Sequence, residues 1–139
     1  MGGRVVAIDL GDRRIGIAVS DPERIIASPA GAILRRAGKK IPVEKLIARA
    51  RELDADEFVV GLALDAEGED TARAVDARWL AAELTKRTGK SARLVDERFT
   101  TAKARRAIRE MGGDPASRRG DVDALAAAVL LQHALGLAP

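Results

Sequence analysis

The sequence predicts one α/β domain built around a mixed sheet. Short β-favouring runs alternate with segments in which apolar residues recur at helical spacing, and this alternation is typical of strands joined by helices. The first β-favouring run is instead followed by turn residues and a second alternating run, which predicts an antiparallel hairpin at the N-terminus. With 139 residues and no internal repeat or linker, the chain fits a single domain with one core.

The hairpin is predicted within residues 4–21, which read RVVAIDLGDRRIGIAVSD. Val5–Ile8 is too short for a helix and long enough for a strand that is buried on both faces. Turn residues Leu10–Asp12 follow, and apolar residues then alternate with small or polar ones from Ile15 to Ser20. This arrangement places Asp9 at the rim of the hairpin.

Residues 42–61 predict a helix and then a strand. Pro42 suits a first helical turn. The apolar residues after it recur at helical spacing, namely Val43, Leu46, Ile47, Ala50 and Leu53. Phe58–Val60 then predicts a buried strand that ends at Gly61.

A longer helix is predicted after Asp70 and Thr71, either of which can cap it. The inner stripe of this helix is predicted to comprise Val75, Trp79, Ala82 and Leu84. Thr88 and Gly89 close the helix, because glycine readily adopts the left-handed conformation in which many helices end.

The last third of the chain predicts a strand, a helix, a loop and a second helix. The strand begins at Leu94 and ends in an Asp-Glu pair, and Thr100 or Thr101 caps the helix that follows. Residues 112–120 are rich in glycine and predict a flexible loop. From Asp121 an alanine-rich helix is predicted to run nearly to the end of the sequence.

Composition excludes several classes of protein. Hydrophobic residues make up 47% of the chain but aromatic residues only 2%, so alanine, valine, leucine and isoleucine must fill the core. The chain has no cysteine and a single histidine, His133, which excludes disulfide scaffolds, cysteine–zinc sites and thiol nucleophiles. We expect a cytoplasmic protein with no membrane partner, because no apolar run approaches ~20 residues and the N-terminus lacks a signal-peptide pattern.

The charge pattern suggests a polyanionic partner. The 24 lysines and arginines exceed the 21 acidic residues by only three, but many basic residues occur as adjacent pairs. These pairs are Arg13-Arg14, Arg35-Arg36, Lys39-Lys40, Arg105-Arg106 and Arg118-Arg119. Several of them flank acidic residues, as a site that handles nucleic acid near metal ligands requires. A solvated surface is an equal alternative for the pairs between Arg35 and Lys40.

Gly11 and Gly16 lack a Cβ, which leaves room for a phosphate or another backbone.

Three carboxylates are candidate metal ligands: Asp9, Glu97 and Asp123. An ionised carboxylate in an apolar setting is costly unless a cation or hydrogen bonds compensate it. Asp9 and Glu97 end β-favouring runs, and the carboxyl ends of parallel strands line a common crevice. Side chains alternate across a strand, so Glu97 shares a face with Val95 while Asp96 shares the other face with Leu94. Spacing alone does not decide which of these two acids enters the site.

Each acid also has a structural interpretation. Asp9 can be a turn residue that bonds its own loop, and Glu97 can pair with Arg98. Asp123 can stabilise the helix dipole from the first turn. Asp121 competes with Asp123, because either can cap that helix.

Four segments, AIDLGDRRIGIAVSD, VVGLALDAEG, VDERFTT and DVDALAAAVLLQ, resemble in order and spacing the blocks of the YqgF family. These proteins are also called RuvX-type, Holliday junction resolvase-like proteins, or pre-16S rRNA nucleases. The resemblance extends from Val5 to about Leu135. It implies an RNase H-like fold with a mixed five-stranded sheet, in which N-terminal antiparallel strands are followed by parallel strands and helices flank the sheet. The chain departs from the family's usual sequence at Ala63 and Asp65, where proline and asparagine are common.

The resemblance implies metal-dependent cleavage of a phosphodiester bond. The family's acidic positions fall on Asp9, Glu97 and Asp123, and its pattern favours Asp123 over Asp121. In a two-metal site of Mg²⁺ or Mn²⁺, Asp9 would bridge both ions, Glu97 would hold one and Asp123 the other. The residues expected to contact nucleic acid are Arg13, Arg14, Arg98, Thr101, Lys103, Arg106, Arg118 and Arg119.

Three functional hypotheses follow from the sequence. The first is a metal-dependent endonuclease that processes the 5′ end of precursor 16S rRNA in ribosome biogenesis. The second is the same chemistry on branched DNA, as in a Holliday junction resolvase, and the third is a non-catalytic nucleic-acid-binding module. A resolvase favours a symmetric dimer, but the sequence shows no hydrophobic dimer seam. We therefore expect a monomer or a weak homodimer.

Overall fold

Five strands form one mixed sheet in the order β3-β2-β1-β4-β5, in a computed structural model that describes residues 3–35, 40–100, 102, 106, 110 and 119–137. The strands are β1 (Arg4–Leu10), β2 (Arg14–Ser20), β3 (Ala27–Leu34), β4 (Ala55–Leu62) and β5 (Ala92–Asp96). Strand β2 pairs antiparallel with both β1 and β3, whereas β4 pairs parallel with β1 and β5 parallel with β4. The predicted mixed five-stranded sheet and the N-terminal hairpin are confirmed.

Strand β3 is the one strand that we did not locate in the sequence. Its segment contains Pro29 and Gly31, both of which are uncommon inside strands. Pro29 is tolerated because β3 lies at the edge of the sheet and pairs only with β2, so a missing N–H need not break a ladder on both sides.

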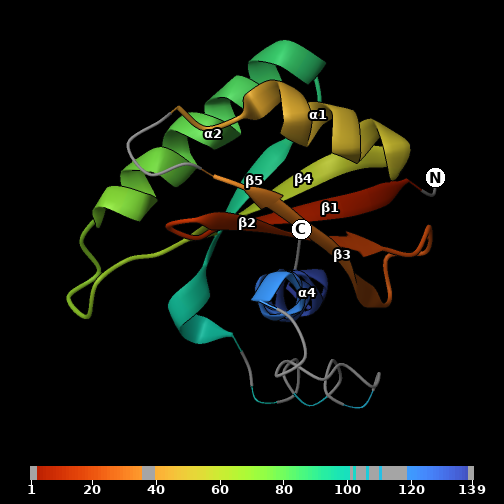
Figure 1. Ribbon diagram of the computed structural model, residues 1–139. Coiled ribbons are helices and arrows are strands. Elements are labelled where there is room, and N and C mark those ends of the chain that lie inside the picture. The colour runs from red at the N-terminus through yellow and green to blue at the C-terminus, as the bar shows by residue number, and fades with distance from the viewer. Residues whose placement is uncertain are drawn as a thin grey trace.

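Helices cover both faces of the sheet (Figure 1). Helices α1 (Val43–Glu52) and α2 (Ala72–Thr88) lie on one face, and α4 (Arg119–Leu135) lies on the other. Helix α4 begins two residues before the predicted start at Asp121, so Arg119 and Gly120 are helical and not part of the predicted loop. The rest of that loop lies outside the described residues. Among the described helices, none is both long and apolar enough to cross a bilayer.

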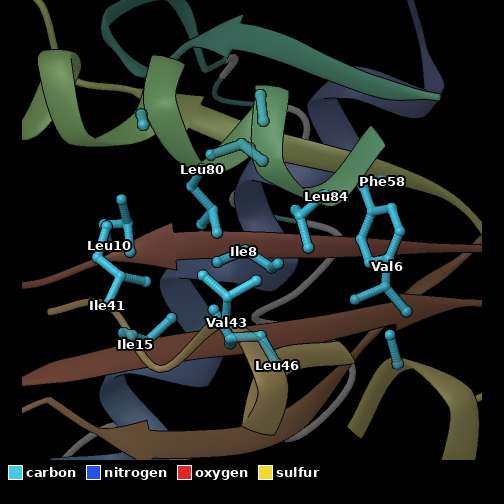
Figure 2. Packing of buried hydrophobic residues seen from close by; sticks show 14 of the residues in the cluster. Val6, Ile8, Leu10, Ile15, Ile41, Val43, Leu46, Phe58, Leu80 and Leu84 are labelled. Carbon is cyan, nitrogen blue, oxygen red and sulfur yellow. The ribbon is translucent and has the colours of Figure 1, made fainter. Parts of the chain in front are cut away.

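The core between the sheet and helices α1 and α2 contains the larger apolar side chains (Figure 2). Strand β1 contributes Val6, Ile8 and Leu10, and β4 contributes Phe58 and Val60. The predicted stripe of α1 is confirmed for Val43, Leu46, Ile47 and Ala50, while Leu53 is only partly buried.

The predicted inner stripe of α2 is wrong except at Leu84. Val75, Trp79 and Ala82 are exposed. The buried stripe comprises Ala74, Ala77, Leu80, Ala81 and Leu84. The hydroxyl of Thr71 accepts a hydrogen bond from the backbone N–H of Ala74 and so caps the helix. Small alanines on the inner side allow α2 to lie close to the sheet, which a valine and a tryptophan there would prevent. The predicted end of the helix at Gly89 is confirmed, with φ of 75°.

Small residues line the opposite face of the sheet, where α4 packs. Ala7 of β1 and Ala18 of β2 are fully buried there against a stripe of α4 made of alanine and leucine. The closest approach is at Gly16, where a Cβ would overlap the backbone carbonyl of Asp123. The expectation that Gly16 leaves room for another backbone is thus confirmed, and the backbone in question is that of α4.

Candidate active site

Asp9 and Glu97 meet at the carboxyl ends of the parallel strands, although 88 positions separate them in the sequence. Asp9 is the penultimate residue of β1, and Glu97 begins a short 3-10 turn, η1 (Glu97–Phe99), directly after β5. The two carboxyl groups are joined by a hydrogen bond. Because β1, β4 and β5 run parallel, their carboxyl ends share this edge, as predicted.

Gly61 makes this meeting possible. Strand β4 lies between β1 and β5. Gly61 pairs with Val95 of β5, and it directly follows Val60, which pairs with Ile8 of β1. A Cβ at residue 61 would overlap Oε1 of Glu97. The bare backbone at this position therefore lets the Glu97 side chain lie across β4 toward Asp9.

The structure also decides between the two adjacent acids. Val95 is buried on the α4 side of the sheet, while Leu94 packs on the side of α1 and α2, so Glu97 lies on the α4 side by alternation. Asp96 instead accepts hydrogen bonds from the guanidinium and the backbone N–H of Arg98. This pairing holds the pKa of Asp96 below its usual range.

The environment of Glu97 favours its protonated form when no cation is bound. Burial contributes most, and the hydrogen bond to Asp9 and the charge of Asp9 add to it, raising the pKa of Glu97 to about 8. The charge of Arg73 lowers this pKa and so opposes the shift in part. Two acids this close resist full ionisation, and carboxylate oxygens are the ligands that hard divalent cations prefer. The pair therefore suits Mg²⁺ or Mn²⁺.

A cleft of about 300 Å³ opens beside the acid pair. Its lining comprises Asp9, Glu97, Thr100, Ala126, Val129 and Leu130. The last three residues belong to α4 and give the cleft an apolar wall, which limits the access of water and strengthens electrostatic interactions at the acids.

Asp123 lies nearby but does not join the pair. It is partly buried in the early part of α4, and its carbonyl lies at Gly16, the strand partner of Asp9. Within the part of the chain that the structure describes, no three histidine, aspartate or glutamate side chains stand close enough to hold one metal ion. The side chain of Asp121 lies outside the description, so the choice between Asp121 and Asp123 stays a prediction.

Arg98 stabilises the turn that contains Glu97. Besides Asp96, its guanidinium donates hydrogen bonds to the backbone carbonyls of Asp65 and Ala66, in the loop after β4. Asp65 in turn accepts two backbone N–H groups of its own loop. Arg98 thus pairs with Asp96, whereas the structural interpretation of the sequence had it pairing with Glu97.

The other residues expected to contact nucleic acid have varied positions. Arg13 is exposed in the β1–β2 turn, Arg14 is partly buried at the start of β2, and Arg106 is helical and exposed. Thr101, Lys103 and Arg118 lie outside the described residues, as does the side chain of Arg119.

Sequence reasoning missed Arg73. This residue lies in the first turn of α2, and its Nε donates a hydrogen bond to Oδ1 of Asp12 at 3.3 Å. None of the basic pairs or quoted motifs includes Arg73, so only the fold brings it to the acid pair.

Comparisons with known proteins identify relatives of this chain. A family model described as RuvX: Holliday junction resolvase matches residues 3–136. A protein of Clavibacter sepedonicus named "Putative pre-16S rRNA nuclease" is 40% identical over 133 residues, which are 96% of this chain and 83% of that protein. A Mycobacterium tuberculosis protein of the same name is 40% identical over 132 residues, which are 94% of this chain and 76% of that protein.

Solved structures of RuvC resemble the whole fold. Thermus thermophilus RuvC, in complex with a Holliday junction substrate, matches with a TM-score of 0.56 and 16% identity over 96% of this chain and 93% of that chain. This likeness confirms the RNase H-like fold that the sequence resemblance implied.

We predict that the metal-free protein loses stability as pH rises through the pKa of Glu97. The folded-state pKa of about 8 lies above the ordinary value of 4.5, so the folded state holds a proton that the unfolded state has released. This stabilising contribution is fully present below pH 4.5 and is lost as pH rises through about 8. Denaturant unfolding in chelator at about pH 5, 7 and 9 measures it.

The Glu97→Gln variant removes the titrating group and should flatten this part of the pH dependence. Glu67→Gln changes an exposed glutamate of the β4–α2 loop and should keep the wild-type slope. An equal slope in Glu97→Gln and the wild type would contradict the assignment.

Proposed function

Because the chain belongs to the RuvX family, we propose that it is a metal-dependent endonuclease that cleaves phosphodiester bonds in structured nucleic acid. We propose further that its substrate is precursor 16S rRNA, which it processes at the 5′ end in ribosome biogenesis. The names of relatives that share 40% of its residues support this substrate. The observation that carries the proposal is the hydrogen-bonded pair of Asp9 and Glu97 at the edge of the sheet.

The donor set fits the proposed metal. Asp9 and Glu97 offer carboxylate oxygens, and Asp123 is the third proposed ligand. Within the described chain, the Asp123 carboxylate makes no hydrogen bond or ion pair that would compete with a metal ion. Two bound Mg²⁺ or Mn²⁺ ions would lower the pKa of the attacking water and stabilise the leaving oxygen of the phosphodiester.

The chain's own residues prepare the site for that role. Antiparallel pairing with Gly16 of β2 fixes the backbone of Asp9, and the contacts of Arg98 with Asp96 and the β4–α2 loop fix the turn of Glu97. Groups held in place in this way do not have to be ordered during the reaction. The apolar wall from α4 keeps the acids partly out of water, so their attraction for a cation is stronger than at an open surface.

Basic residues would hold the polyanion. Arg13 and Arg106 are exposed, and we propose that they contact the nucleic-acid backbone together with the remaining predicted residues. A network of such contacts makes binding depend steeply on salt concentration.

Branched DNA is the second candidate substrate, favoured by the description of the matching family model as a Holliday junction resolvase. Two symmetric cuts in a four-way junction require two active sites related by symmetry, and hence a dimer. A monomer in solution favours the RNA substrate, and a dimer that forms on the junction favours the DNA substrate.

We predict that the purified protein cleaves a structured RNA carrying the precursor 16S 5′ end with Mg²⁺ or Mn²⁺, and not in chelator. Asp9→Asn should reduce cleavage more than about a hundredfold, because it removes a charge from the proposed metal site, while the fold and RNA binding are retained. Gel assays of RNA and four-way DNA junctions side by side measure this.

The matched control for this prediction is Asp54→Asn. Asp54 is an exposed acid that precedes β4, at the opposite edge of the sheet. Cleavage by Asp9→Asn at nearly the wild-type rate would refute the role of Asp9. Binding of either substrate without any cleavage would indicate a non-catalytic module.

The third ligand can be identified by changing Asp121 and Asp123 separately to asparagine. We predict that Asp123→Asn raises the Mn²⁺ concentration needed for half-maximal cleavage by at least about tenfold, since it removes an oxygen ligand. Asp121→Asn should leave that concentration unchanged. The reverse result would make Asp121 the ligand.

A further inference from the structure

Arg73 lies at the same edge of the sheet as the acid pair. It is the second residue of α2. The hydroxyl of the N-cap residue Thr71 donates a hydrogen bond to the backbone carbonyl of Ala63, which directly follows β4. The start of α2 is therefore fastened to the carboxyl end of β4. Because β1 and β4 are parallel neighbours, this fastening places the first turn of α2 beside the β1–β2 turn that follows Asp9.

The contact between Arg73 and Asp12 shows this proximity directly. Nε of Arg73 lies 3.3 Å from Oδ1 of Asp12, in the β1–β2 turn. The side chains are 45% and 80% exposed, so water and salt screen this ion pair and it is weak. In the described part of the chain, Nε is the only Arg73 nitrogen that makes a hydrogen bond. The rest of the guanidinium fork remains available to an anion.

Two other arginines near this end of the strands already have close partners. Arg35 forms a 2.6 Å ion pair with Asp76, and its side chain is only 16% exposed. Arg98 binds Asp96 and two backbone carbonyls. Arg73 combines proximity to the acid pair with a weak and exposed partner.

The electrostatic coupling runs in both directions. Asp12 contributes most to raising the pKa of Arg73, and the charges of Asp9 and Glu97 add to it. Arg73 in turn lowers the pKa of Glu97. An anion bound by Arg73 would therefore lie within the field of the acid pair.

We propose that Arg73 binds a backbone phosphate of the substrate next to the acid pair, and that Asp12 holds its guanidinium until that phosphate replaces it. A planar guanidinium matches the oxygens of a phosphate in a two-bond arrangement. Exchanging an exposed carboxylate for a phosphate keeps the charge of Arg73 compensated at little cost. This inference rests on the proposed function, because it requires a nucleic-acid substrate.

The test is a comparison of binding by the full-length wild type and five variants. A labelled RNA hairpin or four-way DNA junction is titrated in chelator and followed by fluorescence anisotropy. The variants are Arg73→Ala, Arg73→Lys, Asp12→Asn, the double variant Asp12→Asn/Arg73→Ala, and Arg78→Ala. Arg78 lies on the same helix and pairs with Asp70, so its variant is the control for loss of a positive charge.

We predict that Arg73→Ala weakens binding about tenfold or more, because a charge-assisted hydrogen bond is lost, and lowers the salt dependence by about one phosphate contact. Arg73→Lys should lie between Arg73→Ala and the wild type. Asp12→Asn should tighten binding, up to about fivefold, by freeing the guanidinium. That gain should vanish in the double variant.

Three outcomes would overturn the inference. Binding by Arg73→Ala equal to that of Arg78→Ala would remove Arg73 from the substrate site. If Asp12→Asn tightens binding even when Arg73 is alanine, the gain in affinity comes from the removed negative charge and not from freeing the Arg73 guanidinium. A wild type that neither binds nor cleaves either nucleic acid would end the proposed function as well, whereas normal cleavage by Arg73→Ala would leave that function intact.

Discussion

The carboxyl groups of Asp9 and Glu97 come from β1 and from the end of β5, and β4 lies between those strands. They meet because the strands are parallel, so that their ends coincide, and because Gly61 of β4 has no side chain in the space where Oε1 of Glu97 lies. The proposed catalytic chemistry depends on this meeting. The raised pKa of Glu97, the proposed cation site and the electrostatic field at Arg73 all arise from two acids that are held together.

The two faces of the sheet have different residue sizes, and the difference serves the site. Large aliphatic residues and Phe58 fill the side of α1 and α2, where they supply most of the apolar burial. Small residues on the other side let α4 approach until its backbone meets Gly16. That approach supplies the apolar wall of the cleft and brings Asp123 to the strand that pairs with β1. A chain with few aromatic residues is suited to this close packing.

The sequence predicted those features that depend on local pattern. The hairpin, the position of Asp9, the stripe of α1 and the glycine that ends α2 all follow from spacing and turn chemistry, and the structure confirms them. Strand β3 escaped notice because Pro29 and Gly31 interrupt its pattern, which an edge position tolerates. The stripe of α2 was misplaced because Val75 and Trp79 are the larger apolar residues, whereas packing selected the smaller alanines. The choice of Glu97 over Asp96 and the position of Arg73 depend on contacts between distant segments, which local spacing does not contain.

The most direct test of the central claim is the cleavage rate of Gly61→Ala, with Gly136→Ala as its control, since a Cβ at Gly136 makes only ordinary contacts. Circular dichroism and anisotropy confirm that each variant is folded and binds nucleic acid. The added methyl group should displace the Glu97 carboxylate and reduce cleavage about a hundredfold, because a displacement of this size misaligns a reacting group. Wild-type cleavage by folded Gly61→Ala would show that the contact between Asp9 and Glu97 is not what makes this site work.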